Sequence, residues 1–490
     1  MHYIRLLRPP AVTQTGTKNS IKNIVKVVLT ITTDLGESFL CPDSPIKLVF
    51  NLEHEVPNPA AVQETNAGTT ATRKRKFSGA HEEESGGGTV GSTRDGGTPE
   101  TADQVTDPPT SSHPRTTETV TTQLQAEGKN NSSVWRAGMR VLKAELVIPQ
   151  RIADKLENVS TDRPTGSSAS DGLETGLMGL GKDATRPRLF IQPEDSLLSA
   201  VYSNDLLQKG HGLIMPVWSE LAFFGQDPEH HSSRRLVLGD HGDENSGPVS
   251  VVVEEEIGES IARHVWDAGV VTVALLQDIC STSITRKYTN TLPELRKILL
   301  DSEELRILEL GSGVGILGIG AAQILGRCRS PHGQKTFFLL TDLHEAEDQA
   351  RRNISIFEGS QTPTTNPGTS IVKLEWGALD WDLGRKGLFG DLKAVRSTPF
   401  DLVMLSDCTY NVDMLPSLVG TLSALHDLSR GMGKDCKVLL ATKPRHPSEK
   451  ELFELMSEER WSIAEEVTLP LAVLASEDEQ VEVYLFSRRA

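Results

Sequence analysis

Hydrophobic and polar positions in the second half of the chain follow two alternating patterns, which predict strands separated by helices. Short apolar runs such as LRILEL and FDLVMLSD are typical of buried strands, whereas AEDQARRNISIF and MLPSLVGTLSALHDL have the longer period of helices. This alternation is typical of a mostly parallel sheet covered on both faces. The expected strands are 305–310, 336–342, 371–376, 400–407, 436–442 and 479–487, and the last of them is predicted to be antiparallel to its neighbour.

The first half of the chain has strand-like alternation that is interrupted by long polar stretches. Residues 20–52 are rich in β-branched side chains, residues 134–150 are predicted to form a further strand pair, and 187–257 contain more strand-like pieces, which together favour a β-rich domain. Residues 62–133 consist mainly of Thr, Gly, Ser, Pro and Glu, and such a segment buries too little apolar surface to offset its ordering entropy. We therefore expect a disordered insertion there and a flexible linker at 157–186. The predicted organisation is a β-rich domain at 1–61 and 134–253, followed by an α/β domain at 254–490.

The formal net charge of −17 on the 490 residues indicates which kind of partner to expect. Binding of nucleic-acid phosphates needs clustered cations, so we expect no direct nucleic-acid partner and favour a basic protein instead. Five scattered cysteines without a CxxC pair favour a reducing compartment and predict neither disulfides nor a metal site. No apolar run reaches the roughly 18 residues of a membrane span, and no secretory signal is recognisable. We expect a monomer in the cytoplasm, the nucleus or both.

Two basic runs have alternative interpretations. RKRKF at 73–77 is either a nuclear-localisation signal or a solvated charge cluster. KPRH at 443–446 follows the fifth strand of the α/β domain, and it is interpreted as a solvated loop or as a contact to substrate backbone.

The stretch LRILELGSGVGILGIGAA, residues 305–322, carries the first element of a candidate site. Glycines at alternate positions follow a strand and precede a small-residue helix, which lets the backbone approach a nucleotide closely. The glycines that begin at Gly313 match the dinucleotide fingerprint, but this match starts beyond the end of the strand and not directly at it. The frame that begins at Glu309 instead places an acid there, suited to receive the ammonium group of an amino-acid moiety.

Polar and aromatic side chains follow the other predicted strands. Asp342 ends the second strand, where a carboxylate can accept the ribose hydroxyls of an adenosine or cap the next helix. After the third strand, Trp376 or Trp381 would pack on an adenine face or in the core. The fourth strand ends in SDCTY, whose Asp407 and Tyr410 would either line an amine-accepting channel or serve as a helix cap and a core residue.

Taken together, these motifs resemble the seven-strand S-adenosylmethionine-dependent methyltransferases. More narrowly, they resemble the lysine methyltransferase family, also called methyltransferase family 16, and within it the methyltransferase-like protein 22 group and its fungal relatives. The resemblance covers about residues 254–490 and implies a Rossmann-like, seven-stranded domain after the β-rich half. It is carried by VWDAG (265–269), LELGSGVGILG (308–318), LLTD (339–342), LDW (379–381) and SDCTY (406–410).

The resemblance also implies S-adenosylmethionine as the cofactor and a role for each matching residue. Trp266, in a segment at 258–271 that is predicted to be helical, would lie near the cofactor. The glycine turn would hold the methionine end, Asp342 the ribose and Trp381 the adenine. The implied cofactor contacts are Trp266, Glu309, Gly311, Gly313, Asp342, Trp381 and Ser406, and the expected catalytic residues that guide the amine are Asp407 and Tyr410.

The predicted activity is methyl transfer to a lysine of a basic protein substrate. A lysine amine has an unperturbed pKa of about 10.4, so the site must desolvate it into its neutral form and direct its lone pair. Methylation of a histidine or a small amine fits the same motifs. Two other classes remain as alternatives: a cofactor-binding interaction protein without catalysis, and a nicotinamide-dependent oxidoreductase, for which no hydride-transfer residues are identifiable.

Overall fold

The computed structural model describes most of both halves of the chain. Two compact units divide it: Met1–Glu53 together with Thr121–Ala490, and His54–Val120. The RKRKF run lies outside the described residues, as does the predicted linker up to residue 185. The described ranges are 1–17, 20–57, 117–127, 133–154, 186–222, 226–239, 249–258, 263–281, 286–329, 334–361, 371–390, 392–471, 473–474 and 479–489.

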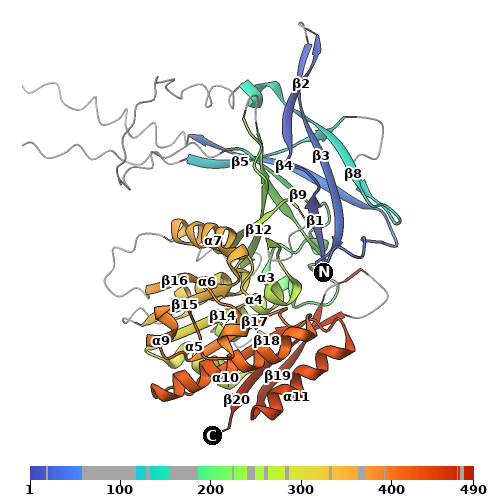
Figure 1. Ribbon diagram of the computed structural model, residues 1–490. Helices are drawn as coiled ribbons and strands as arrows, with labels where there is room; N and C mark the ends of the chain where they lie inside the picture. The colour runs from blue at the N-terminus through green and yellow to red at the C-terminus, as the bar shows by residue number, and fades with distance from the viewer. Residues whose placement is uncertain are drawn as a thin grey trace, which may run out of the picture. The chain divides into compact units, whose positions relative to one another are not determined.

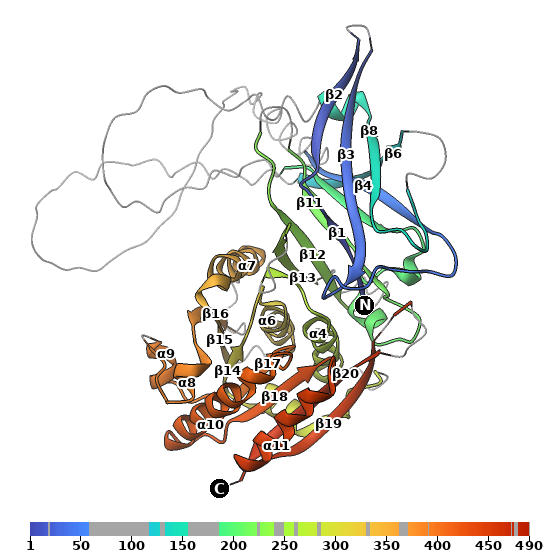
Figure 2. The ribbon, with the colours of Figure 1, turned by 45° about the vertical axis from the view of Figure 1, so that its right-hand side comes forward.

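Strands of the first half form two mostly antiparallel sheets (Figures 1 and 2). The alternating sequence places one face of several of these strands in a shared core; along β8, for example, every second residue is buried. The first sheet runs β10 (Ile214–Met215), β1 (His2–Leu6), β3 (Ser20–Thr33), β8 (Leu142–Ile148) and β6 (Gln125–Ala126), with β2 (Ala11–Thr17) also on β3. The second runs β13 (Val249–Glu256), β12 (His231–Leu238), β11 (Val217–Glu220), β9 (Arg188–Pro193), β4 (Ile46–Pro57) and β5 (Thr117–Gln123), with β7 (Val134–Trp135) beside β4.

The predicted disordered insertion at 62–133 is too long at its C-terminal end, because β5 and β6 lie within it. Between these strands Leu124 is buried, and its N–H donates to the carbonyl oxygen of Phe50 at 2.8 Å. In the segment TETVTTQLQA, Val120, Thr122, Leu124 and Ala126 are less exposed than the polar residues between them, so it has a strand pattern although its composition resembles that of the low-complexity residues before it.

The second half of the chain forms the expected mixed sheet with helices on both faces. Its first five strands are parallel, and β20 is antiparallel to both of its neighbours, as predicted. In the described residues this sheet has seven strands, ordered β16 (Ile371–Ala378), β15 (Lys335–Asp342), β14 (Glu304–Leu310), β17 (Leu402–Ser406), β18 (Lys437–Thr442), β20 (Glu479–Arg488) and β19 (Trp461–Leu471).

Successive residues of the central strand β14 point to opposite faces, so Ile307 and Leu308 belong to two different cores. The core that contains Ile307 is covered by α4 (Asp267–Cys280), α5 (Pro293–Asp301), α6 (Ile316–Cys328) and α7 (Glu347–Ser360). The core that contains Leu308 is covered by α8 (Trp381–Gly384), α9 (Lys393–Ser397), α10 (Leu415–Gly431) and α11 (Glu451–Glu458).

Strand register brings the polar ends of β14, β15 and β17 to one edge of the sheet. Leu310 pairs with Thr341 on one side and with Leu405 on the other, so all three strands end within about one residue of each other. The chain reverses its direction of winding at β14, and ligands of open α/β sheets bind at such a point.

The helix predicted at 258–271 is wrong in its extent, because α4 begins only at Asp267. Trp266 precedes the helix in an extended conformation. The start is set by two carboxylates that accept from the first backbone N–H groups: Asp34 from Asp267 at 3.3 Å and Asp407 from Ala268 at 2.7 Å. A search of the described helices finds none with the length and hydropathy of a membrane span.

Candidate functional site

A cavity of about 410 Å³ opens beyond the carboxyl ends of β14, β15 and β17. Its volume lies within the range of roughly 300–1,000 Å³ that is usual for small-molecule sites. Most of the side chains predicted from the motifs meet here. The predicted residues that line the cavity are Trp266, Gly311, Gly313, Asp342, Trp381, Ser406, Asp407 and Tyr410.

The turn after β14 depends on glycine. Gly311, Gly313 and Gly315 all have positive φ, at 63°, 52° and 82°. At Gly311 a Cβ atom would lie 2.5 Å from Sγ of Cys408 and 3.5 Å from the Trp381 ring, so a larger residue would collide with the cavity wall. The turn therefore lets the backbone line a space that side chains would fill.

Asp342 fixes this turn from the neighbouring strand. One carboxylate oxygen accepts from the Gly313 N–H at 2.7 Å, and the other accepts from the Leu343 N–H at 2.7 Å. Since a carboxylate offers about four lone-pair sites, some remain for a ligand in the cavity. Asp342 is not the N-cap of α7, which begins at Glu347. Burial raises the pKa of Asp342, although the two backbone N–H groups oppose that shift.

The structure contradicts the role predicted for Glu309. Its side chain is buried beneath the turn and outside the cavity lining, and it accepts from the N–H of Gly318 at 3.0 Å. Burial raises the pKa of Glu309 to about 8, so the carboxyl group is largely protonated at neutral pH. It supports the first turn of α6 and does not supply a charge for an ammonium group.

The raised pKa of Glu309 makes the stability of the protein depend on pH. The native state retains a proton that the unfolded chain releases, so the contribution is complete at low pH and is lost as pH rises toward about 8. We expect the free energy of unfolding of the wild type, relative to Glu309→Gln, to fall by about 1.4 kcal/mol per pH unit between pH 5 and 7. Urea unfolding over this range tests it. If the free energies of unfolding of the two proteins change equally with pH, the prediction is wrong. Glu345→Gln, a change at the surface, is the control variant.

The two tryptophans after β15 have different places. Trp381 lines the cavity as the first residue of α8. Trp376 is buried in the core with the Arg351 guanidinium 5.4 Å from its ring, outside the cavity lining. Trp266 also lines the cavity, and the Arg445 guanidinium lies 5.4 Å from its ring centre.

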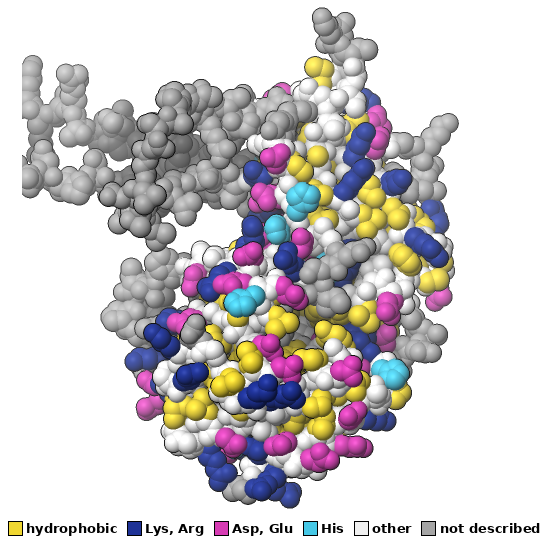
Figure 3. Space-filling view, in the orientation of Figure 1, with side chains coloured by type: hydrophobic (Ala, Val, Ile, Leu, Met, Phe, Trp, Pro, Cys, Tyr) yellow, Lys and Arg dark blue, Asp and Glu magenta, His cyan; other side chains and the backbone are white. Residues whose placement is uncertain are grey.

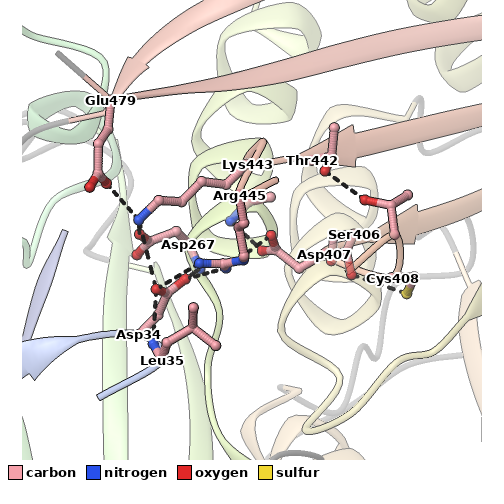
Figure 4. A network of polar contacts seen from close by, with 12 residues as sticks. Asp34, Leu35, Asp267, Ser406, Asp407, Cys408, Thr442, Lys443, Arg445 and Glu479 are labelled. Carbon is pink, nitrogen blue, oxygen red and sulfur yellow. Dashed lines mark hydrogen bonds and ion pairs between the residues drawn. The ribbon is translucent and has the colours of Figure 1, made fainter. Parts of the chain in front are cut away.

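Asp407 lines the cavity but is also held in an ionic network (Figure 4). Its oxygens accept from the Ala268 N–H at 2.7 Å and from Arg445 at 3.3 Å, and its backbone has a positive φ of 53°. The capping role is therefore real, although the helix that it caps is α4 and not the one that follows in sequence. Burial raises the pKa of Asp407 to about 7, against the lowering effect of Arg445. Tyr410 does not pack in the core; it is 57% exposed at the cavity rim.

Two members of this network were not predicted. Arg445 binds the carboxylate of Asp34 through both terminal nitrogens, at 3.2 and 2.7 Å, and Figure 4 shows the Asp34 and Asp407 carboxylates both turned toward it. The interpretation of KPRH as a solvated loop is therefore wrong, because Lys443 and Arg445 are mostly buried and ion-paired. Asp34 lies in a turn of the first half and belongs to no motif, so the sequence carries no signal for it.

No group of three or more His, Cys, Asp or Glu side chains in the described part of the chain has a geometry suited to a metal ion.

Charged side chains of both signs are interspersed on the face shown in Figure 3.

Comparison with known proteins gives one family match. Residues 246–459 match the model of the family described as lysine methyltransferase, which confirms the resemblance predicted from the motifs. A UPF0665 family protein of Schizosaccharomyces pombe is 27% identical over 282 residues, which are 56% of this chain and 70% of that protein.

Solved structures of S-adenosylmethionine-dependent methyltransferases are also similar. One from Methanosarcina mazei has 14% identity and a TM-score of 0.27, covering 40% of this chain and 97% of its own. Another, from Clostridium acetobutylicum, has 11% identity and a TM-score of 0.25, covering 39% and 85% respectively.

Proposed function

We propose that this protein is a protein-lysine N-methyltransferase that uses S-adenosylmethionine. The observation that carries the proposal is the cavity at the strand ends, where the glycine turn, the Asp342 carboxylate and the Trp381 ring face one space. The family match of residues 246–459 supports the same activity.

The residues of the cavity fit an adenosyl amino-acid cofactor. Gly311 leaves room that a Cβ would occupy, and the buried Ser312 hydroxyl in the wall has no hydrogen-bond partner within the described residues. Asp342 retains acceptor sites for ribose hydroxyls, and Trp381 offers an aromatic face for adenine. When bound, S-adenosylmethionine supplies an electrophilic methyl group on a sulfonium.

A cationic substrate side chain suits this cavity. Its lining contains the acids Asp342, Glu345, Asp380 and Asp407, and no Lys or Arg among the described residues. An incoming lysine ammonium is therefore attracted, and the apolar walls at Val314, Ile316 and Met414 favour its neutral form by desolvation.

Asp407 and Tyr410 are the groups that we assign to the amine. Both line the cavity, Asp407 in its wall and Tyr410 at its rim. A pKa of about 7 lets Asp407 take up a proton near neutral pH, and the Tyr410 hydroxyl can orient the nitrogen lone pair by a hydrogen bond. The work of the site is mainly to position the amine for in-line attack.

The substrate is proposed to be a basic, lysine-bearing protein, in keeping with the net charge of −17. All five cysteines are free thiols, which supports a reducing compartment such as the cytoplasm or nucleus.

Calorimetric titration with S-adenosylhomocysteine, with NAD as the comparison ligand, tests the cofactor assignment. We expect saturable binding of the first ligand alone. Asp342→Ala should weaken it by about 10- to 100-fold, because the variant loses roughly 1.5–3 kcal/mol of charge-assisted hydrogen bonding. Asp348→Ala removes an exposed acid outside the cavity lining and should retain affinity within about threefold. Unchanged affinity in Asp342→Ala, or preferential binding of NAD, would contradict the assignment.

A further inference from the structure

We propose that a second hollow binds the stretch of substrate polypeptide that flanks the target lysine. This β-domain groove has a volume of about 960 Å³. Its walls come from β1 with the residues after it, from the end of β3 with the following turn, and from the end of β13. The inference rests on the proposed function and adds to it the surface that selects the substrate.

The groove adjoins the cofactor cavity. His264 and Trp266 line both hollows, so these residues form their shared wall. A polypeptide seated in the groove therefore lies next to the cavity whose lining includes Asp407 and Tyr410.

Unpartnered polar groups line the groove. The hydroxyls of Thr30 and Thr32, both more than nine-tenths buried, and Nε of Arg5 have no hydrogen-bond partner within the described residues. Thr30 is the cross-strand neighbour of Arg5, so these groups lie close together on one sheet face. Leaving such a group unpaired costs roughly 1–3 kcal/mol. A peptide main chain supplies both acceptors for Arg5 and donors or acceptors for the hydroxyls.

Large apolar side chains surround these polar groups. Leu7, Leu35, Phe39 and Val141 all line the groove and are exposed, Leu7 by 51% and Leu35 by 42%. Exposed apolar side chains gathered around a hollow mark surfaces that bind other molecules, because burying them is favourable. This combination suits a polypeptide with apolar side chains next to its lysine better than a small amine.

The groove is anchored to the catalytic residues. Asp34 lies in its wall, and the Asp34 carboxylate binds Arg445, which in turn contacts Asp407. Asp34 also accepts from the first N–H of α4. This buried connection fixes the position of the groove relative to the cavity. A surface that presents one particular residue of a bound chain needs such a fixed position.

Kinetics with a defined peptide test the inference. An array of 12-residue peptides, each with one lysine, is incubated with the full chain and tritium-labelled S-adenosylmethionine, and the best-methylated peptide is kept as the probe. Leu35→Ser and Thr32→Val are expected to raise KM for this peptide at least tenfold with kcat within about threefold. Leu197→Ser, at a leucine that is 53% exposed and lies outside the groove, is the control and should change neither. Anisotropy of the fluorescein-labelled peptide with S-adenosylhomocysteine present should show the same loss of affinity.

Failure of the groove and failure of the activity give different results. Wild-type KM values in both groove variants, with the peptide methylated, would overturn the groove inference alone. An array without a methylated lysine would overturn the proposed function and the groove with it. Equal losses of S-adenosylhomocysteine affinity in the groove variants would also overturn the inference, since they would place these residues at the cofactor.

Discussion

Asp267→Ala is expected to lower the free energy of unfolding by about 3–5 kcal/mol, the usual loss when one partner of a buried ionic cluster is removed. The Asp267 side chain is fully buried and accepts from Lys443 Nζ at 3.0 Å, the Tyr3 hydroxyl at 2.7 Å and the Met1 amino group at 2.9 Å. Alanine leaves these donors buried without their shared acceptor. Urea unfolding followed by circular dichroism measures the loss.

The pH dependence of this loss separates it from simple loss of packing. Burial alone would raise the pKa of Asp267, but the positive charges of Met1 and Lys443 outweigh it and hold the pKa below its usual range. The stabilisation is therefore present above about pH 4 and disappears as pH falls further, so the gap between wild type and variant should narrow in acid.

A surface ion pair provides the matched control for Asp267→Ala. Asp427 is 64% exposed and lies 2.7 Å from Arg488, so Asp427→Ala should cost less than about 1 kcal/mol. Similar losses for Asp267→Ala and Asp427→Ala would show that the buried network does not stabilise the fold as we infer.

The parts of this structure that the sequence predicts well are those with local causes. The glycine turn, the carboxylate of Asp342 and the parallel strands follow from patterns that span a few residues, and strand register then brings their ends together without further information. Trp381 could be favoured over Trp376 only through the family resemblance, because both lie at the carboxyl end of β16, Trp376 within the strand and Trp381 just after it.

Long-range contacts account for what sequence reasoning missed. Asp34 and Arg445 are 411 residues apart, and no local pattern connects them. Long-range contacts also explain two errors. Asp34 pairs with Arg445 of the KPRH loop, and the carboxylates of Asp34 and Asp407 accept from the first N–H groups of α4. The role predicted for Glu309 rests on its position in the motif. Whether a carboxylate at this strand end faces a ligand or the following helix depends on packing around Gly318, which the motif does not specify.

Gly311→Ala is expected to weaken S-adenosylhomocysteine binding at least 100-fold, about 2.7 kcal/mol. Two effects combine: the residue has a φ of 63°, which disfavours a side chain, and the new Cβ would lie 2.5 Å from Sγ of Cys408 in the cavity wall. The collision displaces Cys408 or the turn, and either movement alters the space between Trp381 and Gly313. Calorimetric titration measures the loss.

Two further variants separate the collision from the backbone strain. Gly433 lies outside the cavity lining and has a φ of 85° with nothing within 4 Å of the position that a Cβ would take. Gly433→Ala therefore controls for backbone strain elsewhere in the fold and should leave affinity unchanged. Cys408→Ala removes the sulfur that the Cβ meets, so the double variant Gly311→Ala/Cys408→Ala should recover at least tenfold of the lost affinity. If the double variant binds as weakly as Gly311→Ala, the contact with Cys408 is not the cause. The requirement for glycine would then lie in the backbone conformation of the turn itself.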